Sequence, residues 1–86
     1  MKKLIKEVEG EGLESLLGEY VVIFCSNYHY SGKLVGVNTV DILLEDAAIV
    51  YETGGLCDKQ FKDAQPLPGA LYVRTQAVES YYRRGF

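Results

Sequence analysis

A cysteine and a histidine four residues apart, Cys25 and His29, are the residues best suited to chemistry in this sequence. On either side of a hairpin turn they would form a thiol nucleophile and its base, or, with Cys57 and Asp58, a metal site. The chain has only one histidine, so a second imidazole for a triad or a zinc set is missing. Because a glycine-rich phosphate loop is absent as well, we expect no enzyme, no metal site and no cofactor. Cys25 is then a small core residue and His29 a partly exposed strand residue.

Tyrosines and basic residues offer a second kind of chemistry, the binding of single-stranded nucleic acid. Six tyrosines alternate with strand-forming residues, and they form either a platform on which bases stack or core and interface contacts. They are Tyr28, Tyr30, Tyr51, Tyr72, Tyr81 and Tyr82. Cations gather near the two ends, where they form either a basic rim for RNA or solvated termini. These cations are Lys2, Lys3, Lys6, Arg83 and Arg84.

Length and composition limit the kind of protein that carries these residues. A chain of 86 residues with 48% apolar and 24% charged residues is expected to fold as one domain with a small core. The net charge of −3 and a pI of about 5.0 argue against a protein that binds duplex nucleic acid through contacts with many phosphates. The sequence contains no apolar run long enough to cross a membrane and no signal-peptide pattern, so we expect an intracellular, cytoplasmic protein with no membrane partner.

The elements that position the candidate residues begin with a short helix over about residues 11–17. Leu13, Leu16 and Leu17 follow a helical spacing, and Gly18 stops the helix. The continuously apolar run 20–25 predicts a buried strand, and Ser26-Asn27 predicts a tight turn into a second strand over 28–37. Further strands are expected over 40–45, 48–52, 70–74 and 77–82, with turns at 45–46 and 75–76.

Glycines interrupt the second strand and predict its shape. Gly32 and Gly36 lie between bulky neighbours on one face, a pattern suited to a strand that bends around a small barrel. Residues 53–69, which contain glycines, prolines and charges, predict either an irregular loop or a ribbon extending from the sheet. Short strands after one short helix indicate a small, strongly bent antiparallel sheet.

Two motifs in this arrangement resemble the Sm-like (LSm and Hfq) family. The first motif is resembled by Leu16, Leu17, Gly18, Tyr30, Gly32, Leu34, Asn38, Asp41, Leu44, Glu45, Asp46 and Ala47, and the second by residues 73–78. The resemblance covers about residues 13–82 and implies a mainly β, SH3-like, five-stranded, strongly bent barrel with a short N-terminal helix. It also implies no enzymatic activity.

The resemblance further implies a homo-oligomeric ring of about five to seven subunits, and the edge strands give a physical reason for one. An open barrel leaves two strands with unpaired backbone groups, and a head-to-tail contact that closes into a ring removes both edges. The residues expected at this interface are Leu71, Tyr72, Val73, Val78, Ser80 and Tyr82, with Tyr81 beside them.

The resemblance also implies single-stranded, uridine-rich RNA as a partner, bound at the inner rim of the ring. Arg74 matches the second-motif arginine, which supplies a cation, and Gln76 supports it. Asn38, Thr39 and Asp41 line the first-motif turn, with Asn38 at the usual Asp position and Asp41 at the usual Asn position. This turn is one residue shorter than the family pattern and has no aromatic residue.

An alternative function stays open because of these departures. Asp41 accepts hydrogen bonds only and either repels phosphate or neutralises Arg74. A ring that acts as a structural or protein-interaction module, with a degenerate RNA pocket, is therefore the second hypothesis. Arg74 as an RNA contact stands beside Arg74 as the partner of Asp41 or of a neighbouring subunit.

Overall fold

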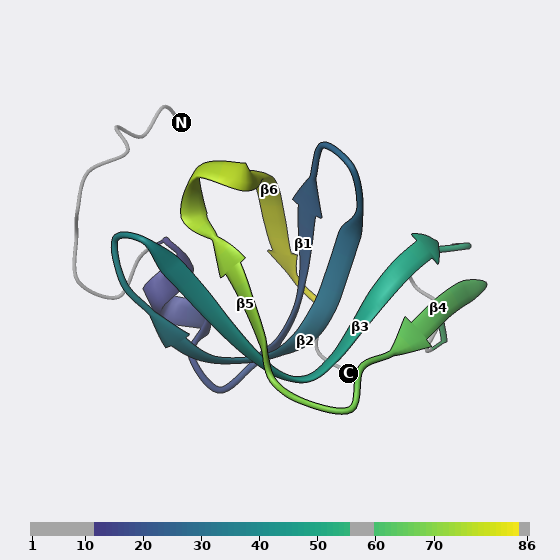
Figure 1. Ribbon diagram of the computed structural model, residues 1–86, viewed down its shortest axis with the longest axis horizontal. Coiled ribbons are helices and arrows are strands. Elements are labelled where there is room, and N and C mark those ends of the chain that lie inside the picture. Colours follow the sequence, from purple (N-terminus) through teal and green to yellow (C-terminus); the bar gives the residue numbers. More distant parts are fainter. Residues whose placement is uncertain (1–11, 56–59, 85–86) are drawn as a thin grey trace, which may run out of the picture.

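The computed structural model describes residues 12–55 and 60–84, and all of the strands among them belong to one curved antiparallel sheet (Figure 1). The elements are η1 (Leu13–Leu16), β1 (Tyr20–Cys25), β2 (His29–Val37), β3 (Asp41–Glu52), β4 (Asp63–Pro66), β5 (Leu71–Arg74), η2 (Thr75–Ala77) and β6 (Val78–Arg83). The strand order is β4-β3-β2-β1-β6, and β5 pairs with the first part of β3. In Figure 1 the far end of β3 runs out to the side together with β4.

The pairing of β2 with β3 is irregular at Gly32, where the two backbones approach closely. Ser31 pairs with Ala48 and Lys33 with Glu45, so β3 carries an extra residue opposite Gly32. This residue belongs to a β-bulge in which Asp46 has a positive φ of 51°. A Cβ added to Gly32 would lie 2.9 Å from the Glu45 carbonyl oxygen, so only glycine lets the two backbones approach. The bend predicted from the glycine pattern is confirmed.

The core fills the inside of this curve with aliphatic side chains from several strands. Its buried members are Val21, Ile23, Cys25, Leu34, Ile42, Leu44, Ala47 and Val73, and Leu13, Leu16 and Leu71 pack against it from the sides. Each fully buried Leu, Ile or Val contributes about 1.5 to 3 kcal/mol relative to an exposed position. A core made by β1, β2, β3 and β5 together holds the turns at the ends of β3 and β5 in a fixed relation.

The predicted helix over 11–17 is wrong in type and length, and residue 11 lies outside the described residues. The structure has a single 3-10 turn, η1, bounded by Gly12 at φ 73° and Gly18 at φ 88°. Glycines in the left-handed conformation at both ends leave no room for a second turn. Leu17, expected on the buried face, is 48% exposed, while Gly18 donates its N–H to the Leu34 carbonyl and ties the turn to β2.

Two strands expected separately over 40–45 and 48–52 are one continuous strand, β3. The turn expected at Glu45-Asp46 is the bulge described above, because the β2 partner continues past it on both sides. The excursion over 53–69 includes β4, which pairs with the far half of β3, so a ribbon rather than an irregular loop extends the sheet there. The mainly β, strongly bent antiparallel fold class is otherwise the one predicted.

β5 and β6 are edge strands. Each is paired on one side only, β5 with β3 and β6 with β1, and within residues 12–55 and 60–84 they do not pair with each other. They are joined by η2 alone. Each strand therefore presents a row of backbone groups that another strand can pair with.

Candidate nucleic-acid interface

Two turns that are far apart in the sequence meet at one end of the sheet. The turn 38–40 leads into β3, and η2 follows β5, so the antiparallel pairing of Asp41 with Arg74 brings both to the same place. The backbone N–H of Thr75 donates to the Val40 carbonyl at 2.9 Å, which extends the pairing beyond the strands. The main predicted RNA-binding residues are thus gathered in one small region.

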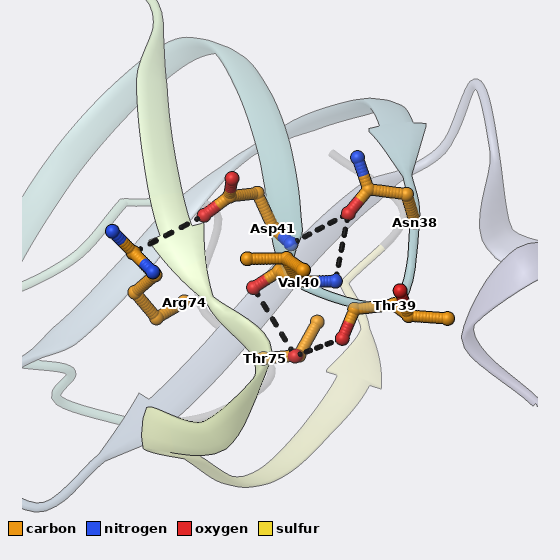
Figure 2. A network of polar contacts seen from close by, with 6 residues as sticks. All are labelled: Asn38, Thr39, Val40, Asp41, Arg74 and Thr75. Atoms are coloured by element: carbon orange, nitrogen blue, oxygen red, sulfur yellow. Dashed lines mark hydrogen bonds and ion pairs between the residues drawn. The ribbon is translucent and has the colours of Figure 1, made fainter.

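Asn38 shapes the first turn with its side-chain oxygen. Its Oδ1 accepts hydrogen bonds from the backbone N–H groups of Val40 and Asp41, both at 2.8 Å (Figure 2). The backbone N–H of Asn38 in turn donates to the Asp41 carbonyl at 3.0 Å. Asn side chains commonly stabilise turns in this way. The oxygen of Asn38 is therefore committed to the turn, and only its amide nitrogen remains for another partner.

Thr75 locks the two turns together. Its hydroxyl donates to the Thr39 carbonyl oxygen at 2.8 Å, with the Val40 carbonyl oxygen at 3.2 Å (Figure 2). From the sequence, Thr75 was expected only in the turn at 75–76 and in the second motif, residues 73–78, so its role in the site was missed. No local signal reveals it, because its partners lie 35 and 36 residues away.

Arg74 and Asp41 form an exposed ion pair across this junction. The Arg74 Nε lies 3.5 Å from Asp41 Oδ1, and the two side chains are 76% and 33% exposed. Exposed pairs of this kind contribute about 0 to 1 kcal/mol, so the contact orients both groups without withdrawing them from solvent. The ion pair expected as one role of Arg74 is present, and most of the guanidinium remains accessible.

A hollow of about 150 Å³ lies beside the pair. It is lined by Thr39, Val40, Arg74, Thr75 and Gln76. Asn38 and Asp41 belong to the same junction but do not line the hollow. Val40, which is 50% exposed, was not predicted as a site residue, although an apolar residue inside a polar turn is a signal that the sequence offered. The arrangement suits a flat group that packs on Val40 and contacts Arg74.

The alternative chemistry at Cys25 and His29 is contradicted by the register of the strands. Phe24 pairs with His29, and their rings meet edge to face at 4.6 Å between centroids. Cys25, the next residue, points to the opposite face and is buried in the core, where burial raises the pKa of its thiol. Cys57 and Asp58 lie outside the described residues. Within residues 12–55 and 60–84 no group of three or more metal-binding side chains gathers.

The tyrosines are divided among several environments and do not form one platform. Tyr28 contacts Tyr30 and Tyr51, with ring centroids 6.5 and 6.0 Å apart. Tyr82 stacks on Phe24 at 5.7 Å, whereas Tyr72 is 67% exposed on edge strand β5. A single stacking surface built from all six is therefore absent from the part of the chain that the structure describes.

The basic residues near the C-terminus are engaged in contacts of their own. Arg83 pairs with Glu19 at 3.3 Å, and the Arg84 guanidinium lies 3.7 Å from the centre of the Phe61 ring. Burial lowers the pKa of Arg84. Lys2, Lys3 and Lys6 lie outside the described residues.

The residues predicted for an oligomer interface lie on the two edge strands. Tyr72 and Ser80 are exposed, Leu71, Val78 and Tyr82 are half-buried, and Val73 is 5% exposed within the chain's own core. The side chain of Val73 is thus buried in the core of its own chain, and only the backbone of Val73 lies at the edge of the sheet. No helix in the described residues has the length and apolar character needed to cross a membrane.

No protein-family model and no curated protein matches the chain. A heptameric archaeal Sm protein has a similar structure, with a TM-score of 0.65 and 20% identity over 83% of this chain and 93% of that one. The P. aerophilum SmAP1 heptamer gives 0.65 and 20% over 83% and 85%. A Pyrococcus abyssii Sm protein in complex with a uridine heptamer gives 0.61 and 17% over 81% and 89%.

The chain therefore has the fold of Sm proteins. The resemblance seen in the sequence is confirmed at this level, since identities of 17 to 20% establish the shared fold alone.

Proposed function

We propose that this chain assembles into a homo-oligomeric, non-enzymatic ring of about five to seven subunits and binds single-stranded RNA at the junction of the 38–41 and 74–76 turns. The observation that carries the binding proposal is that a hydrogen bond from Thr75 to Thr39 joins these turns. One turn presents the exposed cation Arg74 and the other presents polar groups beside it. Two of the similar structures are described as heptamers and a third contains a uridine heptamer, which supports a ring and a short uridine-rich strand as the first ligand to test.

Ring closure follows from the edges. Among the residues that the structure describes, β5 and β6 each lack a neighbouring strand on one side, and a head-to-tail β5 to β6 contact repeated around a ring would pair both in every copy. The exposed side chain of Tyr72 and the half-buried Val78 and Tyr82 would then add apolar contact at the seam.

Each residue at the junction has a role in this proposal. Arg74 supplies the positive charge for a phosphate and a guanidinium plane for a base. Val40 and Thr39 line the hollow, and Gln76, which also lines it, offers an amide to a base or a sugar. Asn38 and Asp41 hold the turn and present an amide nitrogen and a carboxylate beside Arg74.

Titration of a fluorescent uridine heptamer, followed by anisotropy at low and moderate salt, tests the binding proposal. We expect salt-dependent binding that Arg74→Ala weakens by about tenfold or more, since it removes one phosphate contact and one stacking group from every subunit. Lys62→Ala is the matched control, because Lys62 is also an exposed cation in an exposed ion pair. Its Nζ lies 3.3 Å from Glu52 Oε1, at the end of β3 that pairs with β4. Equal losses in both variants would mean that only net charge matters.

A ring that acts as a structural or protein-interaction module is the second candidate. The net charge of −3 and the Asp41 carboxylate beside Arg74 favour it, because both lower the attraction of the site for phosphate. Failure to bind the oligomer even at low salt, with the ring intact, would leave this candidate in place of the first.

A further inference from the structure

In the proposed RNA site the Asp41 carboxylate lies beside Arg74, where it can contact a base. We infer that Asp41 selects guanine at this position within an otherwise uridine-rich strand. The inference rests on the proposed function, since it assigns the base preference of the same site. It concerns a single contact in each subunit and is compatible with uridines at the remaining positions.

The chemistry of an ionised carboxylate sets the preference. A carboxylate accepts hydrogen bonds and donates none, so its best partner is an edge with two adjacent donors. Guanine has such an edge, because its N1–H and its N2 amino group lie side by side. Uracil has one donor, N3–H, between two carbonyl oxygens, so a carboxylate that accepts this hydrogen bond places its other oxygen against a carbonyl. The two charge-assisted hydrogen bonds to guanine have no counterpart with uracil.

The position of Asp41 leaves its carboxylate both oriented and accessible. Its backbone N–H is held by Asn38 at 2.8 Å, and its Oδ1 lies 3.5 Å from Arg74 Nε. Within residues 12–55 and 60–84 its second oxygen, Oδ2, has no polar partner. Figure 2 shows this oxygen directed away from Arg74. An incoming base therefore finds a free acceptor without breaking the ion pair.

Donors on either side of Asp41 complete the match. Guanine carries the acceptor O6 next to N1–H, so a donor must stand beside the carboxylate. Because Asn38 Oδ1 accepts from two backbone N–H groups, its Nδ2 faces outward, and in the view of Figure 2 it points to the same side as Asp41 Oδ2. Arg74, with a side chain that is 76% exposed, is the other donor and offers a plane for stacking.

A rival reading of guanine at the same site uses Arg74 alone. An arginine fork donates to O6 and N7 of guanine on the edge opposite to N2. The two readings differ in the atoms they need, since Asp41 requires the N2 amino group and Arg74 requires N7. Nucleotide analogues that lack one atom or the other separate them.

The experiment compares four heptamers by anisotropy with the assembled protein. They are all-uridine, alternating uridine and guanosine, and the alternating strand with inosine or with 7-deazaguanosine in place of guanosine. We expect the guanosine strand to bind about tenfold more tightly than all-uridine. Inosine, which lacks the N2 amino group, should lose most of this gain, and 7-deazaguanosine, which lacks N7, should keep it.

Asp41→Asn then tests the residue itself with little change of shape. An amide both donates and accepts, so this variant should lose the preference for guanosine over uridine while still binding RNA. Glu52→Gln is the matched control, because it neutralises another exposed carboxylate of an ion pair on β3, and it should keep the preference.

Three results would overturn the inference. Equal affinity for the uridine and guanosine strands, or a preference for uridine, refutes guanine selection and leaves the proposed RNA binding standing. A preference that 7-deazaguanosine abolishes and inosine keeps reassigns the reading to Arg74. Absence of binding to all four strands refutes the proposed function and the inference together.

Discussion

The hydroxyl of Thr75 donates a hydrogen bond to the backbone carbonyl of Thr39 at 2.8 Å, and this contact spans 36 residues of sequence. It joins the turn before β3 to the turn after β5, and both turns belong to the junction proposed to bind RNA.

Thr75→Val removes the hydroxyl and keeps the shape of the side chain. The loss of one hydrogen bond should lower the free energy of unfolding by about 1 kcal/mol, which lowers Tm by about 4 to 8 °C in a domain of this size. Affinity for a uridine heptamer should fall as well, because the two turns lose the side-chain hydrogen bond that joins them and keep only their backbone contacts. Thr53→Val, which loses only a contact with the adjacent Gly54 carbonyl at 3.1 Å, is the control and should change neither quantity much.

Gly32→Ala tests the bend in the sheet. The added Cβ would lie 2.9 Å from the Glu45 carbonyl and 3.0 Å from Leu44 Cβ, so the strands must separate, at a cost of about 1 to 3 kcal/mol in urea denaturation. A larger residue such as valine should unfold or misassemble the protein. Gly69→Ala meets nothing within 4 Å and should leave stability unchanged. Equal stability of both variants would contradict the close approach of β2 and β3.

Light scattering at micromolar concentration should give a mass of five to seven times 9.6 kDa. Tyr72→Lys places a charge on edge strand β5, where Tyr72 is 67% exposed, and should shift the mass toward the monomer. Leu17→Lys changes a residue that is 48% exposed and belongs to neither edge strand, and it should keep the wild-type mass. A monomer in the wild-type protein would refute ring assembly.

The stability of the protein should fall in alkaline solution, and Tyr20 should account for part of the decline. Its hydroxyl donates to Asp46 at 3.2 Å, and this hydrogen bond, together with the negative charge of Asp46, raises the pKa of Tyr20 above its ordinary value of 10.0. A pKa raised in the folded state stabilises the fold fully below pH 10.0 and loses this contribution as the pH rises through the folded-state pKa.

Urea denaturation from about pH 8 to about pH 11 measures this effect. Tyr20→Phe should be less stable than the wild type at the lower pH, and the difference should shrink as the pH rises. Tyr30, whose pKa is raised chiefly by burial, keeps some alkaline decline in both proteins. A difference that stays constant over the whole range would show that Tyr20 does not titrate differently in the folded state.

Much of the architecture could be read from local patterns. The apolar run 20–25, the turn at Ser26-Asn27 and the glycine-punctuated strand after it appear in the structure as β1, the hairpin and β2. These features depend on residues near one another in the chain, where strand propensity and turn chemistry act directly. The helix was predicted wrongly because the leucine spacing outweighed the glycines that confine it to one 3-10 turn.

Other features arise only from contacts between distant segments. Glu45-Asp46 has turn-forming composition, yet it forms a bulge inside β3, because β2 lies alongside and supplies pairing on both sides. Residues 53–69 became partly a strand for the same reason, since β3 continues far enough to pair with β4.

From its sequence alone this protein reveals a bent β-sheet, since residue type, period and glycine placement are local properties of the chain. The resemblance of its motifs to the Sm-like family adds the candidate residues Arg74, Asn38, Thr39, Asp41 and Gln76. Only the tertiary structure decides that the Asn38 side-chain oxygen accepts hydrogen bonds within the turn, that Arg74 forms an ion pair with Asp41 and that Thr75 joins the two turns. The reason is physical: hydrogen bonds and ion pairs depend on distance and direction, and the register between β3 and β5 sets both.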